Sequence, residues 1–283
     1  METSTMVLRK KVRALLKRLL YARRVTAQWY IRDVNWGDAL NPVLIEYLSE
    51  RKARFDADPY MEKQMVVGSI LELADSNTVV WGAGLIKEGL APKDKPKAIH
   101  ALRGPLTRKQ LLSRGIDAPE VYGDPALLLP LFFNPDVPKK YRVGLIPHYM
   151  DKGHPWLDKH RSDPGICVID VQGGVFSFVE AIKSCDLVVS SSLHGVICAD
   201  AYGVPSIWAE FSDRVLGKGF KFFDYFASVQ RETSAPVRIN ESTSLTQVLS
   251  HQKDYQIQLD KVRLLNACPF LSPNVKRRLE KGR

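Results

Sequence analysis

The segment Leu187-Val-Val-Ser-Ser-Ser-Leu-His194-Gly195 continues as Val196-Ile-Cys-Ala-Asp-Ala-Tyr-Gly-Val-Pro205, and this stretch decides the fold. Its first residues form a short apolar run, which is typical of a buried strand. The three serines that follow favour a turn and the start of a helix. A buried strand that leads directly into a helix is the building block of a parallel sheet.

Short strands and helices alternate on both sides of this segment. The alternation predicts an α/β fold of two Rossmann-like halves with parallel sheets, a glycosyltransferase-B-like arrangement with a cleft between the halves. Ligands of such sheets bind outside the carboxyl ends of the strands. We expect strands at 26–31, 65–70, 78–81, 98–102, 142–147, 166–171, 187–190 and 205–208, and helices at 105–112, 175–183, 194–202, 218–226 and 244–265.

The chain divides into four predicted regions. Residues 130–140 are rich in proline and charge and lack periodicity, which favours a linker between domains. The regions are a basic amphipathic helix at 1–24, an N-terminal Rossmann-like domain at 25–134, a C-terminal Rossmann-like domain at 141–265 and a basic tail at 266–283.

The composition is that of a globular protein, 45% apolar and 25% charged, with a net charge of +10. The four cysteines show no metal-binding spacing, which favours a reducing compartment. No signal peptide is visible, and no apolar run approaches the roughly 20 residues that span a bilayer. These features predict a cytoplasmic protein.

The first segment is both basic and periodic. Residues 9–24 contain eight lysines and arginines and no acid, and leucine and valine recur at helical spacing from Leu8 to Leu20. Such a helix can make peripheral contact with an anionic membrane through residues 8–24, at the inner face of the membrane. The alternative is a helix that docks on the domain and leaves a basic face in solvent.

The serine turn before His194 is the strongest candidate site. A strand-to-helix turn collects backbone N–H groups and hydroxyls at the positive end of a helix, which suits an anion. Imidazole exchanges protons near neutral pH, so His194 is a candidate general acid or base. The alternative is that the serines are only helix caps and that His194 is a satisfied buried histidine.

Other polar groups follow the ends of predicted strands. Arg103 can hold a carboxylate or phosphate, although a lone arginine more often forms a surface salt bridge. Asp38 can bind a sugar hydroxyl, act as a base, or only cap a helix. Gly82 and Gly84 permit close approach of the backbone to a ligand, and His148 follows the first strand of the second half.

Six motifs occur in a fixed order over roughly residues 30–230, and together they resemble the polysaccharide pyruvyl transferase family. No single motif is decisive, because strings such as GDP and GAG are common. The ordered set is much more specific. The motifs are Asn35-Trp-Gly-Asp38, Val80-Trp-Gly-Ala-Gly84, Arg103-Gly-Pro-Leu-Thr107, Gly123-Asp-Pro125, Ile146-Pro-His148 and Ser191-Ser-Leu-His-Gly195.

The resemblance implies phosphoenolpyruvate as donor and an exopolysaccharide, cell-surface glycan or lipid-linked sugar as acceptor, with no cofactor or metal. It also implies Arg103 and His194 in donor binding and catalysis. Some members carry an arginine where this chain has Ser192, and Lys221 can supply the missing charge. The candidate residues are His194 and Asp38 for catalysis, Arg103, Ser191, Ser192, Leu193, Gly195 and Lys221 for the donor, and Asn35, Gly37, Gly82, Gly84 and His148 for the acceptor or cleft.

Two other functions remain open at this point. A nucleotide-sugar glycosyltransferase of the same fold would need an acid to bind a ribose, and Glu210 or Asp213 follows the strand that ends near Trp208. A non-catalytic glycan- or nucleic-acid-binding protein would use the basic ends. The core shows no recognised nucleic-acid motif, so we expect no nucleic-acid partner.

Overall fold

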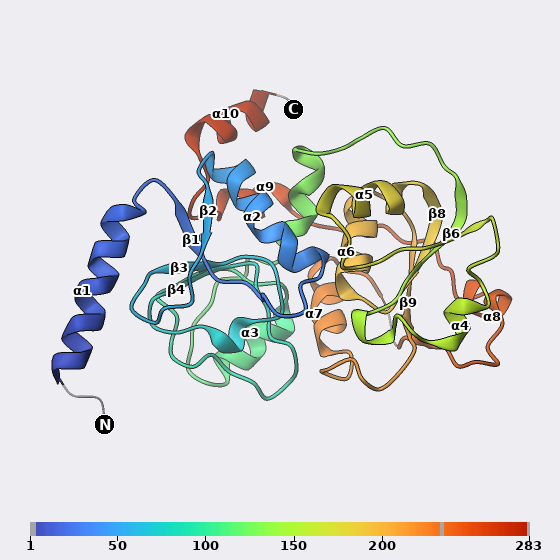
Figure 1. The fold of residues 1–283 in the computed structure, drawn as a ribbon, viewed down its shortest axis with the longest axis horizontal. Coiled ribbons are helices and arrows are strands. Elements are labelled where there is room, and N and C mark those ends of the chain that lie inside the picture. Colours follow the sequence, from blue (N-terminus) through green and yellow to red (C-terminus); the bar gives the residue numbers. More distant parts are fainter. Residues whose placement is uncertain (1–3, 233–234, 282–283) are drawn as a thin grey trace.

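The computed structural model describes residues 4–232 and 235–281, and its core is two parallel sheets of five strands each (Figure 1). The first sheet has the strand order β2-β1-β3-β4-β5, and a parallel bridge from Leu102 to Tyr122 extends its edge. Its strands are β1 (Val25–Ala27), β2 (Ala53–Phe55), β3 (Lys63–Met65), β4 (Thr78–Trp81) and β5 (Ala98–Ala101).

The second sheet has the order β10-β9-β8-β6-β7. Its central strand β8 pairs with β6 from Tyr141 opposite Cys185 to Ile146 opposite Ser190. The predicted α/β fold with two parallel sheets is confirmed, whereas the glycosyltransferase-B-like arrangement stays a prediction. The strands are β6 (Tyr141–Ile146), β7 (Ile166–Val168), β8 (Cys185–Ser190), β9 (Ser206–Glu210) and β10 (Val237–Arg238).

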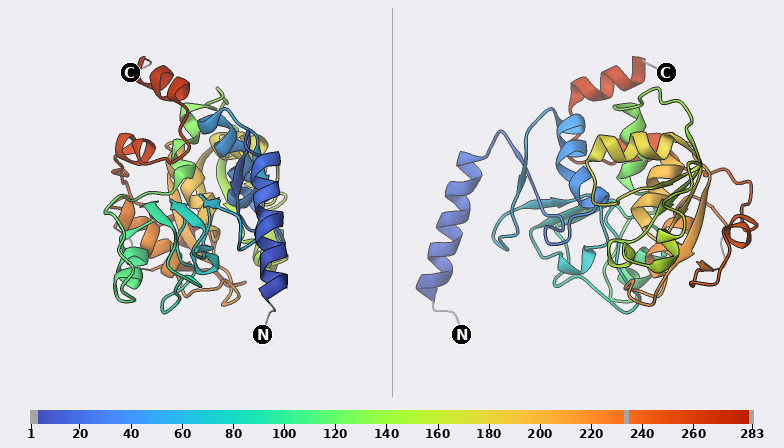
Figure 2. Two further views of the ribbon diagram at one scale, coloured as in Figure 1. Left: turned by 90° about the vertical axis from the view of Figure 1, so that its left-hand side faces the viewer. Right: turned by 45° about the vertical axis from the view of Figure 1, so that its right-hand side comes forward.

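Helices connect and cover the strands (Figure 2). They are α1 (Ser4–Leu20), α2 (Trp36–Ser49), α3 (Pro105–Leu112), α4 (Pro155–Asp158), α5 (Val175–Lys183), α6 (Leu193–Ala201), α7 (Phe220–Ser228), α8 (Leu245–Leu249), α9 (Lys261–Asn266) and α10 (Pro273–Lys281), with 3-10 turns η1 (Leu71–Leu73), η2 (Pro125–Leu131) and η3 (Tyr149–Asp151).

One apolar cluster joins the two halves. It contains Trp36 and Leu40 of α2, Leu127 of η2 and Val196 of α6, and all four side chains are fully buried. Because α2 follows β1 and α6 follows β8, the cluster fixes the start of one crossover helix against the other half. The core therefore brings the carboxyl ends of both sheets together.

The predicted long helix at 244–265 is wrong. Helix α8 ends at Leu249, α9 begins at Lys261, and the chain between them is irregular. The Tyr255 hydroxyl donates to Asp200 Oδ1 over 2.6 Å, and the amide of Gln258 donates to the carbonyl of Val229 over 2.9 Å. These tertiary contacts need an extended backbone and override the local helical preference.

The end of the chain returns to the first half. The indole Nε1 of Trp81 donates to the carbonyl of Leu264, and the amide of Ser272 donates to the carbonyl of Leu48. In Figure 1, α9 and α10 lie beside α2. The first-half sheet is thus covered partly by residues that are far away in sequence.

Candidate active site

The start of α2 is a tightly built cap. Asn35 Oδ1 accepts from the amides of Gly37 (2.9 Å) and Asp38 (3.4 Å), and Asp38 Oδ2 accepts from the amide of Asn35 (3.1 Å). This reciprocal arrangement is a capping box, and it holds Asp38 in a buried position. The indole Nε1 of Trp36 donates to the carbonyl of Val175 over 3.0 Å, so the cap is fixed on the second half.

The serine turn before α6 is also held by its own hydroxyls. Ser190 Oγ accepts from the amide of Ser192 (3.1 Å), and Ser191 Oγ accepts from the amide of His148 (2.8 Å). Neither the Ser192 hydroxyl nor the amides of Leu193 and His194 has a hydrogen-bond partner within residues 4–232 and 235–281. The helix N-terminus therefore presents unpaired donors, as an anion site does.

The side chain of His194, in the first turn of α6, contacts the N-cap of α2. Its Nδ1 lies 2.8 Å from Asn35 Oδ1, and two backbone N–H groups already identify that atom as an acceptor. Nδ1 must then carry the proton, and the lone pair is on Nε2. A Cβ on Gly37 would lie 2.2 Å from the imidazole, so Gly37 is required for this close approach.

Burial keeps both candidate histidines neutral. It lowers the pKa of His194 to about 3, and the positive charges of Lys221 and Arg103 act in the same direction. Burial and then Lys221 lower the pKa of His148 to about 3. His148 Nδ1 accepts from the amide of Met150 at 3.4 Å, so its proton is on Nε2. The two rings thus offer one acceptor and one donor.

Lys221 brings a positive charge to the same place. It stands in the first turn of α7 and is 9% exposed, and within the described residues its ammonium has no hydrogen bond or ion pair. Burial and then the charge of Arg103 lower its pKa to about 8, against the opposing effect of Asp38. Burial raises the pKa of Asp38 to about 7, although the Asn35 amide and Lys221 pull it down.

Arg103 lies close to Lys221, but all three of its guanidinium nitrogens already form hydrogen bonds within the protein. Its Nε donates to Asp224 Oδ2 (3.0 Å) and its Nη2 to the carbonyl of Leu85 (2.6 Å), while Nη1 bonds Ser69. The Thr107 hydroxyl donates to the same carboxylate over 2.7 Å. Asp224 belongs to α7, so the RxxxT motif joins the first half to the helix that carries Lys221.

The predicted glycines support neighbouring side chains. A Cβ on Gly84 would lie 2.5 Å from Arg103 Cζ, and one on Gly195 would lie 2.4 Å from Ser190 Oγ. Gly82 has a φ of +99° and packs against Pro125, where a Cβ would lie 2.2 Å away. All three positions admit only glycine, because they let buried groups touch the backbone.

The structure therefore brings together His194, Asp38, Asn35, Gly37, His148 and Lys221 from both halves, next to the free donors of α6. Sequence reasoning missed Asp224, which has no motif of its own beyond its place after Lys221. Glu210, a candidate for ribose binding, pairs with Arg238 at 3.4 Å. In the described parts of the chain, no group of His, Cys, Asp or Glu is arranged to hold a metal ion.

Comparisons with known proteins agree with this motif set. The family model for polysaccharide pyruvyl transferase matches residues 35–212, more than half of the chain. Protein L143 of Acanthamoeba polyphaga mimivirus is 31% identical over 73% of this chain and 75% of its own. Succinoglycan biosynthesis protein ExoV of Rhizobium meliloti is 30% identical over 76% of this chain and 67% of its own.

Among solved structures, protein KP1_0663 of Klebsiella pneumoniae superposes with a TM-score of 0.46 at 12% identity, over 79% of this chain and 94% of its own. That score is too low to transfer a fold or a site. The sequence relationships are stronger, because the family model spans every motif from Asn35 to Gly195. The chain belongs to the polysaccharide pyruvyl transferase family and is an enzyme of that type.

Proposed function

We propose that this enzyme takes its pyruvyl group from phosphoenolpyruvate and forms a cyclic ketal on two hydroxyls of an exopolysaccharide or its lipid-linked precursor. The observation that carries the proposal is the unpaired, buried ammonium of Lys221 beside two neutral histidines and the free amides of α6. A buried cation with no hydrogen-bond or ion-pair partner is unfavourable, and the ring of Phe222, whose centroid lies 5.7 Å from the ammonium, offsets little of that cost. A small polyanion at this position would supply the missing partner.

Lys221 and the α6 N-terminus hold the donor in this proposal. Phosphoenolpyruvate carries a phosphate and a carboxylate, and each needs a cation or N–H donors in a partly dry site. The amides of Leu193 and His194 and the hydroxyl of Ser192 bind one group, and Lys221 binds the other. Lys221 thereby supplies the positive charge that some family members place, as an arginine, at the position of Ser192.

Arg103 acts as a positioning residue. Its guanidinium is committed to Asp224, Ser69 and Leu85, so it already has partners where Lys221 has none. Together with Thr107 it fixes Asp224, which lies one helical turn from Lys221. Arg103 therefore sets the place of the donor-binding ammonium and adds positive potential to the site.

Ketal formation requires two proton movements. The sugar oxygens bond to C2 of the donor, the C2–phosphate bond breaks, and the methylene carbon becomes a methyl group. Two hydroxyl protons are lost in this reaction. In the net balance, one is gained by the new methyl group and the other by the released phosphate. The enzyme needs a base at the hydroxyls and an acid at the methylene carbon.

His194 is the acid of this scheme. In the free enzyme its pKa is about 3, because it is buried among positive charges. Burial is the main cause of this low pKa and the positive charges add to it. A bound polyanion cancels those charges and opposes the cost of burying the imidazolium, and in this scheme it raises the pKa enough for His194 Nε2 to take up a proton as the donor binds. Asn35 Oδ1 accepts from Nδ1–H in both charge states and keeps the ring in place.

Asp38 is the base. Burial raises its pKa to about 7, which is close to the pH at which a carboxylate best accepts a proton from a hydroxyl. It lies at the first turn of α2, across from His194, and therefore approaches the donor from the other half. An exopolysaccharide acceptor is supported by the name of ExoV, a succinoglycan biosynthesis protein.

Calorimetry with phosphoenolpyruvate tests the donor and the acid together. We expect binding with proton uptake, which shows as a dependence of the heat on the buffer's ionisation enthalpy. His194→Gln should keep donor binding, lose the proton uptake and lower turnover by about 10²–10⁴-fold, the usual worth of a positioned acid. Nucleotide sugars are the control ligands.

Two results would overturn this proposal. Binding of a uridine- or guanosine-diphosphate sugar without binding of phosphoenolpyruvate would assign a different donor. A His194→Gln variant that turns over at nearly the normal rate would remove His194 from the chemistry. Circular dichroism of the variant shows whether a loss of turnover is a loss of chemistry or of folding.

A further inference from the structure

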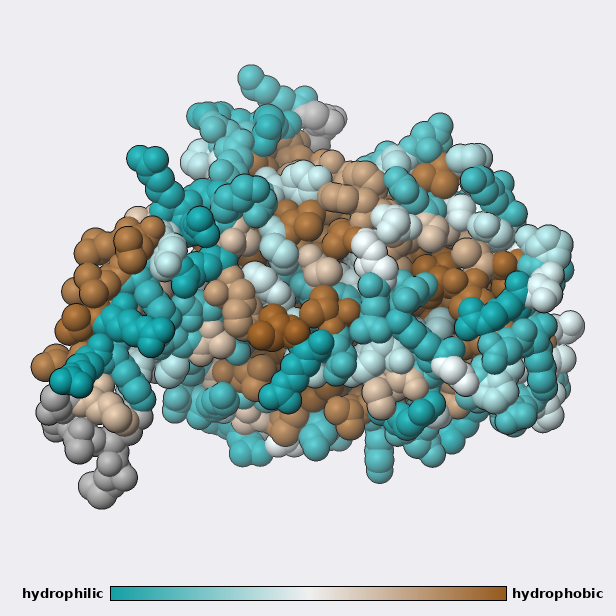
Figure 3. Space-filling model, in the orientation of Figure 1, coloured by the Kyte–Doolittle hydropathy of each residue, from teal (hydrophilic) through white to brown (hydrophobic). Residues whose placement is uncertain are grey.

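Helix α1 turns an apolar face away from the protein. Leu8 is 62% exposed, Leu15 58% and Leu19 70%, and Val12 and Leu16 are exposed beside them. In Figure 3 this face forms a continuous brown strip along the outer edge of the molecule, next to hydrophilic residues. Single exposed leucines are ordinary, but a contiguous apolar strip on one helix marks an interaction surface.

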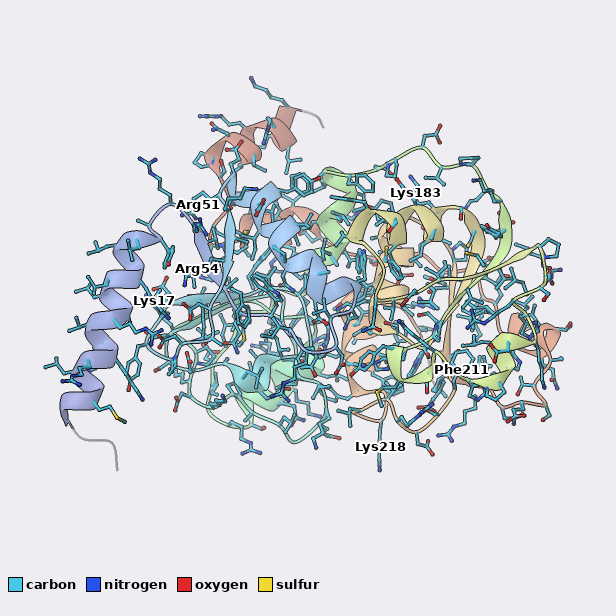
Figure 4. The ribbon with its side chains drawn as sticks, in the orientation of Figure 1. Lys17, Arg51, Arg54, Lys183, Phe211 and Lys218 are labelled. Atoms are coloured by element: carbon cyan, nitrogen blue, oxygen red, sulfur yellow. The ribbon has the colours of Figure 1, made fainter. Side chains whose placement is uncertain are left out.

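The opposite face of α1 is tied to the first half. Lys17 Nζ lies 3.1 Å from Asp56 Oδ2 and 3.0 Å from Asp58 Oδ2, and Ala14 is buried. The guanidinium of Arg54 lies 3.3 Å from the ring centroid of Tyr21, just after the helix. Figure 4 shows Lys17 and Arg54 between α1 and the body. The helix therefore docks by its polar side and cannot fold its leucines inward.

Basic side chains border the apolar strip on both sides. At roughly 100° per residue, Leu8, Val12, Leu15 and Leu19 fall within one narrow arc, and Arg9 and Lys11 stand at its two edges. Both basic side chains are exposed. Leucines in the middle with cations at the edges are typical of a helix that lies in a membrane interface, because long basic side chains reach the headgroups.

The charge of the segment argues against a second copy of the chain as the partner. Residues 9–24 contain no acid, so two α1 helices would bring two sets of like charges together. An anionic bilayer offers both an apolar layer and negative headgroups. No helix of the described residues is long and apolar enough to cross a membrane.

We propose that α1 binds the surface of an anionic phospholipid bilayer, with its leucines in the acyl boundary and the exposed basic side chains beside them, Arg9 and Lys11, on the headgroups. The inference rests on the geometry of α1 alone and does not depend on the reaction. It predicts that the intact enzyme partitions onto membranes while its first half stays attached through Lys17.

Co-sedimentation of the full chain with lipid vesicles tests the proposal. The probes are vesicles of phosphatidylcholine alone and vesicles that also contain phosphatidylglycerol. We expect binding to the anionic vesicles, weakened by high salt. Leu15→Glu with Leu19→Glu should lower the partition coefficient at least about tenfold, because it removes apolar contact and adds negative charge. The matched control is Leu112→Glu with Leu216→Glu, the same charge change at exposed leucines elsewhere.

Three outcomes would overturn the proposal. Equal binding by the α1 variant and the control variant would show that α1 is not the contact. Failure of the unchanged protein to bind anionic vesicles would remove the membrane as the partner. A dimer in sedimentation equilibrium that the α1 variant loses would assign the apolar face to a second copy of the chain.

Discussion

Two buried cations lie close together in this enzyme and differ in how they are satisfied. Arg103 is 1% exposed and makes hydrogen bonds to Asp224, Ser69 and Leu85. Lys221 is 9% exposed and has no such partner in the part of the chain that the structure describes. A satisfied charge belongs to the framework, whereas an unsatisfied charge needs a ligand. Arg103 therefore stabilises the structure around the site, whereas Lys221 is available to bind the ligand.

Helix α7 connects these two cations. Lys221 and Asp224 are three residues apart and so share one face of the helix. Asp224 accepts from Arg103 and Thr107 of the first half, and this contact fixes the direction in which Lys221 points. A change at Arg103 should therefore reach the site through α7, but its first effect should be on folding.

Loss of the Arg103 side chain should have the largest effect on stability. Arg103→Met leaves the Asp224 carboxylate buried with no cation, which typically lowers the free energy of unfolding by about 3–5 kcal/mol. Urea denaturation measures the change. The control is Arg161→Met, since Arg161 and its partner Asp158 are both largely exposed, and we expect a loss of at most about 1 kcal/mol there. Equal losses in the two variants would show that Arg103 is not a framework residue.

Replacement of Lys221 should change the free energy of unfolding in the opposite direction, toward higher stability. Burial lowers its pKa from 10.5 to about 8, so the folded protein carries an unfavourable charge below pH 8. Lys221→Met should raise the free energy of unfolding by about 1–3 kcal/mol and abolish phosphoenolpyruvate binding. The gain should be full below about pH 8, and it should vanish as the pH rises toward 10.5, because the unfolded lysine then also becomes neutral.

The control for this variant is Lys218→Met, which removes the same charge from an exposed side chain that Figure 4 shows pointing away from the body. We expect no change in donor binding and a change in stability within about 0.5 kcal/mol. If Lys221→Met destabilised the protein, the ammonium would have a partner that stabilises the folded state. The contrast with Arg103 would then fail.

Much of the framework is visible in the sequence. Apolar runs such as 187–190 and the turns after them identify most of the strands and the alternation, because a parallel sheet buries both faces of its strands. The predicted strand at 65–70 is wrong beyond Met65, where β3 ends, and the short strands β2 and β10 carry no apolar run and are not predicted. The serine turn also places the N-terminus of α6 correctly. The long helix at 244–265 fails because Tyr255 and Gln258 have distant partners that no local pattern reveals.

The pairing within the site is the part that a single sequence conceals. His194 meets Asn35 across 159 residues, and Arg103 meets Asp224 across 121. Motif spacing identifies His194, Asp38 and Arg103 as candidates but says nothing about which charge is already neutralised. For that reason the sequence names both Arg103 and Lys221 as donor ligands, whereas the contacts favour Lys221 for this task.

The smallest effect should be the change of the catalytic rate with pH, which should depend on both Asp38 and Lys221. In the free enzyme Asp38 must lose its proton to act as a base, and burial places its pKa at about 7. Lys221 must keep its proton to bind the donor, and its pKa is about 8. We therefore expect a bell in kcat/KM for the acceptor at saturating donor, where His194 is already protonated. Its acid limb comes from Asp38 and its alkaline limb from Lys221, and each falls about tenfold per pH unit. Steady-state rates over this range measure it.

Conservative variants assign each limb of that bell. Asp38→Asn should remove most of the activity and flatten the acid limb of what remains, because an amide does not titrate. Lys221→Arg should move the alkaline limb upward, since a guanidinium stays charged to high pH. Arg103 and Asp224 neutralise each other and are not expected to produce either limb. A limb that survives in both variants would therefore arise from a group outside the Asp38–Lys221 pair. A shift of the acid limb in Lys221→Arg would show that the two groups titrate as one coupled pair.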